Sequence, residues 1–202
     1  MNSQITLVDG EAARDASSTL LYFTPDNMKN SIITLGAGDG KPLYVIESNT
    51  DVTRTTLRRG GDSTPFAIVQ RREILADKLS LHGAEPFKVN KWFHYSGTFN
   101  VFPVSLEIEG SKFIWKSSMM GELSLYSVIA PNTPIAWYQC SQRRVVDGRP
   151  VITAAYLVLR PDAVSIQDMV VLSFILLEHR SRMNRKAEGL VAGRACAVDG
   201  VN

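Results

Sequence analysis

The sequence predicts a mainly β protein: a closed antiparallel β-barrel of about 12 strands around one buried apolar α-helix near the C-terminus. Two observations carry this prediction. Short β-prone runs follow one another between residues 20 and 159 and are separated by turn residues at close spacing. Later, the nine residues from Met169 to Leu177 are apolar apart from Ser173. A helix that is apolar on every side must be buried on every side, and only the strands can bury it.

The expected strands lie between two tails. Residues 1–18 and 187–202 lack hydrophobic periodicity, which predicts disordered tails around one domain of residues 19–186. Asp39-Gly40 and Asp147-Gly148 fit two-residue hairpin turns, because glycine accepts a positive φ without steric cost. Strands are expected at residues 20–23, 32–35, 43–47, 53–57, 66–72, 79–82, 87–89, 98–102, 104–108, 112–116, 123–128, 135–140 and 151–159.

The central helix is expected near residues 166–183. Ser165 and Asp168 have the S-x-x-D spacing of a capping box at its start. Basic residues follow the apolar run, and we interpret them as complementing the negative end of the helix. They are Arg180, Arg182, Arg185 and Lys186. The apolar run is far shorter than the roughly 20 residues of a transmembrane helix, so no transmembrane span is expected.

The N-terminus and the cysteines indicate the compartment. The first residues have neither the basic stretch nor the apolar run of a signal peptide. The two cysteines, Cys140 and Cys196, do not make a disulfide framework, which favours a reducing environment. We therefore expect a soluble, cytoplasmic protein.

Charge and motif spacing exclude several functions. A net charge of +2 is too small to indicate a nucleic-acid partner. The three histidines have no cysteine or carboxylate at metal-binding spacing, so neither a metal site nor a cofactor is predicted. Residues 36–41, with the sequence GAGDGK, look like a phosphate loop, but a strand and not a helix follows them. A phosphate loop needs that helix, so a hairpin turn is the better interpretation.

Arginines on or beside the expected strands are the strongest functional lead. They are Arg54, Arg58, Arg59, Arg71, Arg72, Arg143 and Arg144. Guanidinium groups bind phosphate bidentately, so neighbouring strands that bring Arg58, Arg71 and Arg143 together would create an anion-binding site. The partner would be a phosphoinositide or another anionic lipid, or else a protein. The alternative is a solvated exterior on which the arginines are scattered.

A second hypothesis is an enzyme with an unconventional site near Trp92–Ser96, acting on a small apolar molecule. His94, Tyr95 and Ser96 are its catalytic candidates, beside an aromatic run that could line a cleft. The chain has no G-x-S-x-G nucleophile elbow. The absence of a catalytic motif favours a non-catalytic binding or regulatory module and leaves the enzyme hypothesis as the alternative.

A resemblance adds to this interpretation. It rests on short motifs, in order along the chain: FTPDN (23–27) with Asn30-Ser31, DGKPLY (39–44), RTTLRR (54–59), FIWK (113–116), LSLY (123–126), PNTPIA (131–136), and QDMVVLSF (167–174) with Glu178. These motifs resemble an uncharacterised fungal family in the group of the tubby C-terminal domain, the LURP-one-related plant proteins and the phospholipid scramblases. The resemblance implies a barrel threaded by a helix, and an association with phosphoinositides or lipid movement. It supplies no catalytic residue.

Overall fold

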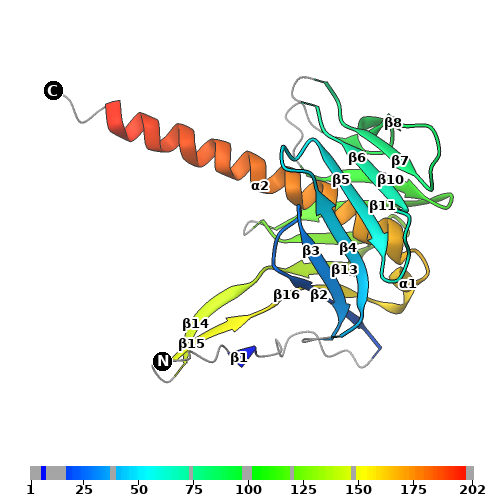
Figure 1. Ribbon diagram of the computed structural model, residues 1–202, viewed down its shortest axis with the longest axis horizontal. Helices are drawn as coiled ribbons and strands as arrows, with labels where there is room; N and C mark the ends of the chain where they lie inside the picture. Colours follow the sequence, from blue (N-terminus) through cyan, green and yellow to red (C-terminus); the bar gives the residue numbers. More distant parts are fainter. Residues whose placement is uncertain are drawn as a thin grey trace.

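The computed structural model describes residues 6–7, 17–36, 40–72, 75–96, 102–118, 121–146 and 149–198. In Figure 1 the strands lie around the first part of a long helix, and the rest of that helix projects away from them. Among the described residues, 13 strands form one large sheet and three form a small one. The mainly β class and the C-terminal helix are therefore confirmed.

The large sheet is antiparallel throughout its described pairs. Its strands are β2 (Thr19–Thr24), β3 (Ser31–Leu35), β4 (Pro42–Ser48), β5 (Arg54–Arg59), β6 (Ala67–Gln70), β7 (Lys78–Leu81), β8 (Phe87–Lys88), β9 (His94–Tyr95), β10 (Val104–Ile108), β11 (Ser111–Ser117), β12 (Leu123–Ser127), β13 (Ala130–Gln139) and β16 (Ala155–Leu159). Their order in the sheet is β8-β7-β6-β5-β4-β3-β2-β16-β13-β12-β11-β10-β9. Most neighbours are consecutive hairpins, and the pairing of β16 with β2 joins the two halves of the chain.

The closed barrel is not confirmed. The large sheet ends at β8 on one side and at β9 on the other, and no described pairing joins these two strands. They are nevertheless close in the sequence, because only the short 3₁₀ turn η2 (Val89–Lys91) and two further residues separate them. The expected strand at residues 98–102 lies almost entirely outside the described residues.

The small sheet has the order β1-β15-β14 and consists of β1 (Thr6–Leu7), β14 (Gln142–Val146) and β15 (Arg149–Thr153). The strands β14 and β15 form a hairpin that projects from the large sheet (Figure 1). The expected strand at residues 151–159 is thus two strands, one in each sheet. The turn residues of this hairpin, Asp147 and Gly148, lie outside the described residues, as does Asp39 of the other expected hairpin turn.

Helix α2 (Gln167–Val198) follows the short helix α1 (Pro161–Val164). Every side chain from Val170 to Leu177 is buried, so the prediction of all-round burial is confirmed. Phe174 lies at the centre and packs against Phe23, Trp115 and Tyr138. The polar Ser173 is satisfied there, because its hydroxyl accepts a hydrogen bond from Trp115 Nε1 and donates to the carbonyl oxygen of Val170.

Helix α2 is longer than the sequence predicted. It continues beyond residue 183 to Val198, into the segment that was expected to be a disordered tail. Arg185, Lys186 and Ala187 are strong helix formers, and a glycine inside a helix costs only about 1 kcal/mol. The glycines at 189 and 193 therefore lower the helical preference of this segment without ending the helix. Despite its length, α2 is not apolar enough to cross a membrane, and the same holds for the other described helices.

Candidate functional site

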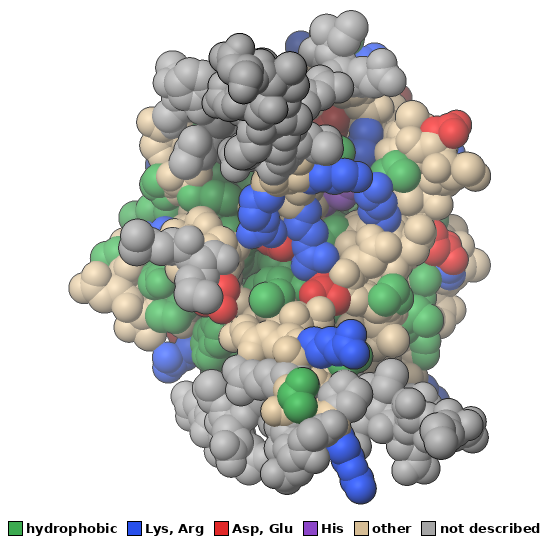
Figure 2. Space-filling model, turned by 90° about the vertical axis from the view of Figure 1, so that its left-hand side faces the viewer, with side chains coloured by type: hydrophobic (Ala, Val, Ile, Leu, Met, Phe, Trp, Pro, Cys, Tyr) green, Lys and Arg blue, Asp and Glu red, His purple; other side chains and the backbone are tan. Residues whose placement is uncertain are grey.

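A pocket of about 690 Å³ opens beside α2 at the point where this helix leaves the sheet; we call it the exit pocket. Three segments that are far apart in the sequence line it. The β6–β7 connection supplies Arg71, Arg72, Leu75, Ala76 and Asp77; the segment from η2 to β9 supplies Val89, Asn90, Phe93 and Tyr95; and α2 supplies Leu176, His179, Arg180, Met183 and Asn184. Figure 2 looks onto the face from which α2 projects, and Lys and Arg side chains gather there around a histidine.

Arg71 is the unusual side chain of the exit pocket. Its side chain is only 15% exposed, and its ion pair with Asp77 is loose, with 3.8 Å between Nη1 and Oδ2. The other two nitrogens, Nε and Nη2, are buried and have no hydrogen-bond partner among the described residues. Burial lowers the pKa of Arg71, and Asp77 opposes this shift only in part. A buried donor without a partner costs about 1–3 kcal/mol, and more when it is charged.

Two further arginines make the exit pocket positive. Arg180 stacks on the ring of Tyr95, with its Cζ 4.9 Å from the ring centre, and its Nη1 donates to the Tyr95 hydroxyl at 2.8 Å. Arg72 is exposed, and its backbone N–H, rather than its guanidinium, bonds to Asp77. Asp77 is the one carboxylate among the lining residues, against three arginines. The lining therefore carries an excess of positive charge.

The pKa of His179 responds to burial and to nearby positive charges. The side chain is buried, and burial together with the charges of Arg71, Lys29 and Arg182 lowers its pKa to about 4. Its imidazole is consequently neutral near pH 7. An anion in the pocket would act in the opposite direction on this pKa.

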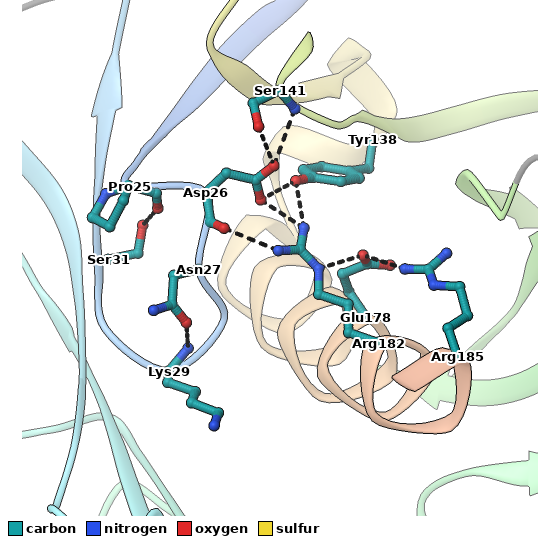
Figure 3. A network of polar contacts seen from close by, with 10 residues as sticks. All are labelled: Pro25, Asp26, Asn27, Lys29, Ser31, Tyr138, Ser141, Glu178, Arg182 and Arg185. Atoms are coloured by element: carbon teal, nitrogen blue, oxygen red, sulfur yellow. Dashed lines mark hydrogen bonds and ion pairs between the residues drawn. The ribbon is translucent and has the colours of Figure 1, made fainter. Parts of the chain in front are cut away.

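A cluster of hydrogen-bonded polar side chains holds the β2–β3 loop against α2 (Figure 3), and its Arg182 comes three residues after His179 of the exit pocket. The carboxylate of Asp26 accepts hydrogen bonds from the hydroxyl of Tyr138 at 2.6 Å, from the backbone and hydroxyl of Ser141 at 3.0 and 2.8 Å, and from Arg182 Nη2 at 2.6 Å. Burial alone would raise the pKa of Asp26, but these bonds outweigh it and keep the pKa below its usual range. We call Asp26, Tyr138 and Arg182 the exit cluster.

Glu178 extends the exit cluster along the helix. Its Oε1 accepts from Arg182 Nε at 2.7 Å and from Arg185 Nη2 at 3.1 Å, whereas its buried Oε2 has no partner among the described residues. Burial raises the pKa of Glu178 although both arginines oppose the shift. Arg182 therefore attaches the helix to Asp26 and Tyr138, whereas Arg185 bonds to Glu178 within the same helix. They do not complement its C-terminal end, since α2 continues to Val198.

A second cluster lies at the beginning of α2, and we call it the start cluster: Tyr44, Arg59 and Asp168. The carboxylate of Asp168 accepts from the Tyr44 hydroxyl and from Arg59. A pocket of about 570 Å³ beside it is lined by Arg59 together with Glu107 and Glu109. Arg59 is already paired with Asp168, and the two glutamates are negative. This pocket is therefore a much weaker candidate for binding an anion than the exit pocket.

The seven predicted arginines do not form one patch. In the pairing of β5 with β6, Arg54 lies opposite Gln70 and Leu57 lies opposite Ala67, so Arg58 and Arg71 are at opposite ends of the pair. Arg143 and Arg144 are on β14 in the small sheet. Arg58 bonds to Glu47, and Arg59 bonds to Asp168. Of the seven, the exit pocket includes only Arg71 and Arg72.

The catalytic candidates near Trp92–Ser96 are not arranged as a catalytic group. The hydroxyl of Ser96 donates to the carbonyl oxygen of Pro103 at 2.7 Å, and no described contact joins it to His94. His94 is exposed on β9 opposite Ser105. Tyr95 lines the exit pocket, but its hydroxyl accepts from Arg180. The described residues also hold no group of three or more His, Cys, Asp or Glu side chains that could bind a metal.

Fold and pocket together define a mainly β domain with a buried helix and a cationic pocket at one end of it. The chain belongs to the family of unknown function DUF6593, which matches residues 26–183. Among solved structures, the X-ray structure of a protein from Arabidopsis thaliana is similar, with 12% sequence identity and a TM-score of 0.44. That match covers 84% of this chain and 98% of the other. No curated protein matches the sequence.

Proposed function

We propose that this protein is a non-catalytic binding module that holds an anionic group in the exit pocket. One observation carries the proposal: Arg71 keeps two buried guanidinium nitrogens without partners beside a pocket that already has a positive excess. A turn of the guanidinium towards the pocket would exchange these unsatisfied donors for hydrogen bonds to an anion. Hydrogen bonds to charged groups contribute about 1.5–3 kcal/mol each.

The size of the pocket and its other donors support the same proposal. Pockets for small molecules usually have volumes of about 300–1,000 Å³, and the exit pocket has about 690 Å³. The amides of Asn90 and Asn184 lie among the lining residues and can donate to oxygen atoms. Arg72 has no described partner for its guanidinium and is free to turn inward. Carboxylate and phosphate are the groups that such a set of donors matches.

The proposal also includes the closure of the sheet, the fold family and the cellular location. Because η2 connects the two end strands of the large sheet, we propose that the sheet is in effect a barrel, closed at β8 and β9 by a short covalent link. A tubby-like membership, a fungal origin and a cytoplasmic location remain part of this proposal, as does an anionic lipid or a protein as the natural partner. No observation favours the enzyme hypothesis over binding.

Calorimetric titration with inorganic phosphate and pyrophosphate, at two salt concentrations, tests the proposal. Binding should weaken with added salt and should be lost in Arg71→Met, which keeps the bulk of the side chain and removes its charge. Arg54→Met is the matched control, because Arg54 is exposed on β5 and lies outside the lining. Wild-type protein that binds neither anion at low salt, or an Arg71→Met variant that binds as wild type does, would contradict the proposal.

A further inference from the structure

Apolar side chains of the exit pocket indicate what the anionic group is attached to. Leu75 and Met183 both line the pocket, yet they are 62% and 49% exposed. Phe93, Leu176 and Val89 form a buried apolar floor in the same pocket. Exposed large apolar side chains around a concave site are typical of a binding surface. A bare phosphate ion would leave most of this apolar surface uncovered.

The cations and the apolar side chains come from the same two segments. On the β6–β7 connection, Leu75 follows the arginine pair Arg71-Arg72; on α2, Met183 comes one turn after the pair His179-Arg180. Residues three or four apart on a helix share a face, so Arg180 and Met183 both point toward the pocket. A ligand whose charged end reaches Arg71 can therefore lie along Leu75 and Met183 with its remaining length.

We propose that the exit pocket binds a monomeric amphiphile: one compact oxyanion, carboxylate or phosphate, attached to a single apolar chain. This inference rests on the proposed function and names the chemical class of its ligand. The oxyanion takes the unpartnered donors of Arg71, and the chain covers Leu75, Met183 and the apolar floor. Such a molecule matches both halves of the lining, whereas a charged headgroup alone matches only one.

The buried surroundings of His179 offer an independent readout. The charged groups around this imidazole are Arg71 from the β6–β7 connection, Lys29 from the β2–β3 loop, and Arg182 on α2. An oxyanion beside Arg71 offsets their field, so occupancy raises the pKa of His179. In an NMR pH titration, the midpoint at which the imidazole resonances of His179 change should therefore lie at a higher pH with the ligand bound. An amphiphile bound elsewhere would leave this midpoint unchanged.

The test is calorimetry on the full chain with octyl phosphate, decyl phosphate and dodecanoate below their micelle concentrations. Inorganic phosphate, dodecyltrimethylammonium and phosphatidylinositol phosphate vesicles are the comparison ligands. Each methylene that enters the pocket should tighten binding about fourfold, so decyl phosphate should bind at least tenfold tighter than octyl phosphate. The cationic amphiphile should bind at least tenfold more weakly than either. A rise in melting temperature with decyl phosphate shows that the ligand stabilises the fold and does not act as a detergent.

Variants separate the two halves of the ligand. Leu75→Gln and Met183→Gln should each weaken decyl phosphate about tenfold and leave inorganic phosphate unchanged, whereas Arg71→Met should weaken both. Ile129→Gln is the control, because Ile129 is an exposed apolar residue outside the lining. Equal affinity for inorganic phosphate and decyl phosphate would overturn the amphiphile inference and leave the anion-binding function intact. Binding of the wild-type protein to the vesicles but not to monomeric amphiphiles would overturn it in favour of a bilayer headgroup. If the wild-type protein bound neither phosphate, nor the amphiphiles, nor the vesicles, both proposals would be wrong.

Discussion

The two ends of the buried part of α2 are held by the same three types of side chain, with the roles exchanged between helix and sheet. In the start cluster the helix supplies the carboxylate, Asp168, and strands supply Tyr44 and Arg59. In the exit cluster the helix supplies the arginine, Arg182, while Tyr138 comes from a strand and Asp26 from a loop. A tyrosine hydroxyl and a guanidinium therefore share one carboxylate at each end.

The clusters differ in burial. The arginine and carboxylate of the start cluster, Arg59 and Asp168, are 50% and 24% exposed, whereas those of the exit cluster, Arg182 and Asp26, are 31% and 15% exposed. The Asp26 carboxylate also accepts four hydrogen bonds. Burial raises the pKa of both tyrosines, and their carboxylate partners raise it further. Both clusters are structural fasteners, since their charges are mutually satisfied. Arg71, in contrast, has two buried nitrogens without hydrogen-bond partners among the described residues. We therefore assign the candidate binding function to Arg71 and not to the two clusters.

The fully buried apolar middle of α2 lies between the two clusters, and a truncation there should have the largest effect. Phe174→Ala should reduce the free energy of unfolding by about 3–5 kcal/mol, because it removes a fully buried aromatic ring that touches three others. Urea denaturation measures the change. Ile129→Ala is the control and should change the stability by less than about 0.5 kcal/mol. A loss below about 1 kcal/mol for Phe174→Ala would mean that the clusters, and not the core, secure the helix.

Acid should lower the free energy of unfolding, mainly through His179 beside the exit pocket. The folded state keeps the pKa of His179 near 4, below the ordinary value of about 6.5, so the unfolded chain takes up this proton first. The free energy of unfolding should therefore fall as the pH drops from about 6.5 to 4, by roughly 3 kcal/mol. Asp26, with its lowered pKa, adds a further loss at still lower pH, whereas the raised pKa of Glu178 acts in the opposite direction just above pH 4.5.

Denaturation at a series of pH values isolates the contribution of His179. In His179→Gln the stability should depend much less on pH between 6.5 and 5, and His94→Gln, at an exposed position, should keep the wild-type dependence. The same slope in wild type and His179→Gln would assign the acid sensitivity to other groups.

The smallest expected change in stability is the difference between removing a side chain from the exit cluster and removing one from the start cluster. Asp26→Ala should cost about 2 kcal/mol, because it removes a largely buried carboxylate that accepts from the Tyr138 hydroxyl, from Ser141 and from Arg182. Arg59→Ala should cost less than about 1 kcal/mol, as is usual for an exposed ion pair. Thermal denaturation of both variants gives the comparison directly. Equal losses would show that burial does not set the strength of these clusters.

The helix and most strands were predictable because they depend on local pattern. The apolar run from Met169 to Leu177 has no polar face, so its burial followed from its composition. The extension of α2 to Val198 was missed because glycines and small residues are typical of tails as well as of weak helices. The closed barrel predicted from the sequence is not confirmed, because local patterns of strands and turns do not determine whether the two end strands, β8 and β9, pair with each other.

The site was predictable only in part, because it depends on long-range register. Arg71 and Arg72 stood out in the sequence as one of several arginine pairs. What distinguishes Arg71 is its burial against His179 and beside Arg180, which are more than 100 residues away in the chain. No local pattern indicates which arginine such packing leaves without partners. From the sequence, a cleft lining was the less favoured interpretation of the aromatic run near Tyr95. Phe93 and Tyr95 line the exit pocket, whereas the neighbouring His94 and Ser96 do not.

The position of α2 after all the strands in the chain matters during synthesis. A ribosome makes all the strands of the large sheet before it makes residues 170–177, which pack in the same core as the buried side chains of those strands. Until then, core side chains of the strands, such as Leu57 on β5 and Trp115 on β11, have no helix to cover them. Exposed apolar faces and unpaired strand edges are the features that make folding intermediates aggregate. Nascent chains that stall before residue 165 should therefore need a chaperone, and should become independent of it once α2 has left the ribosome.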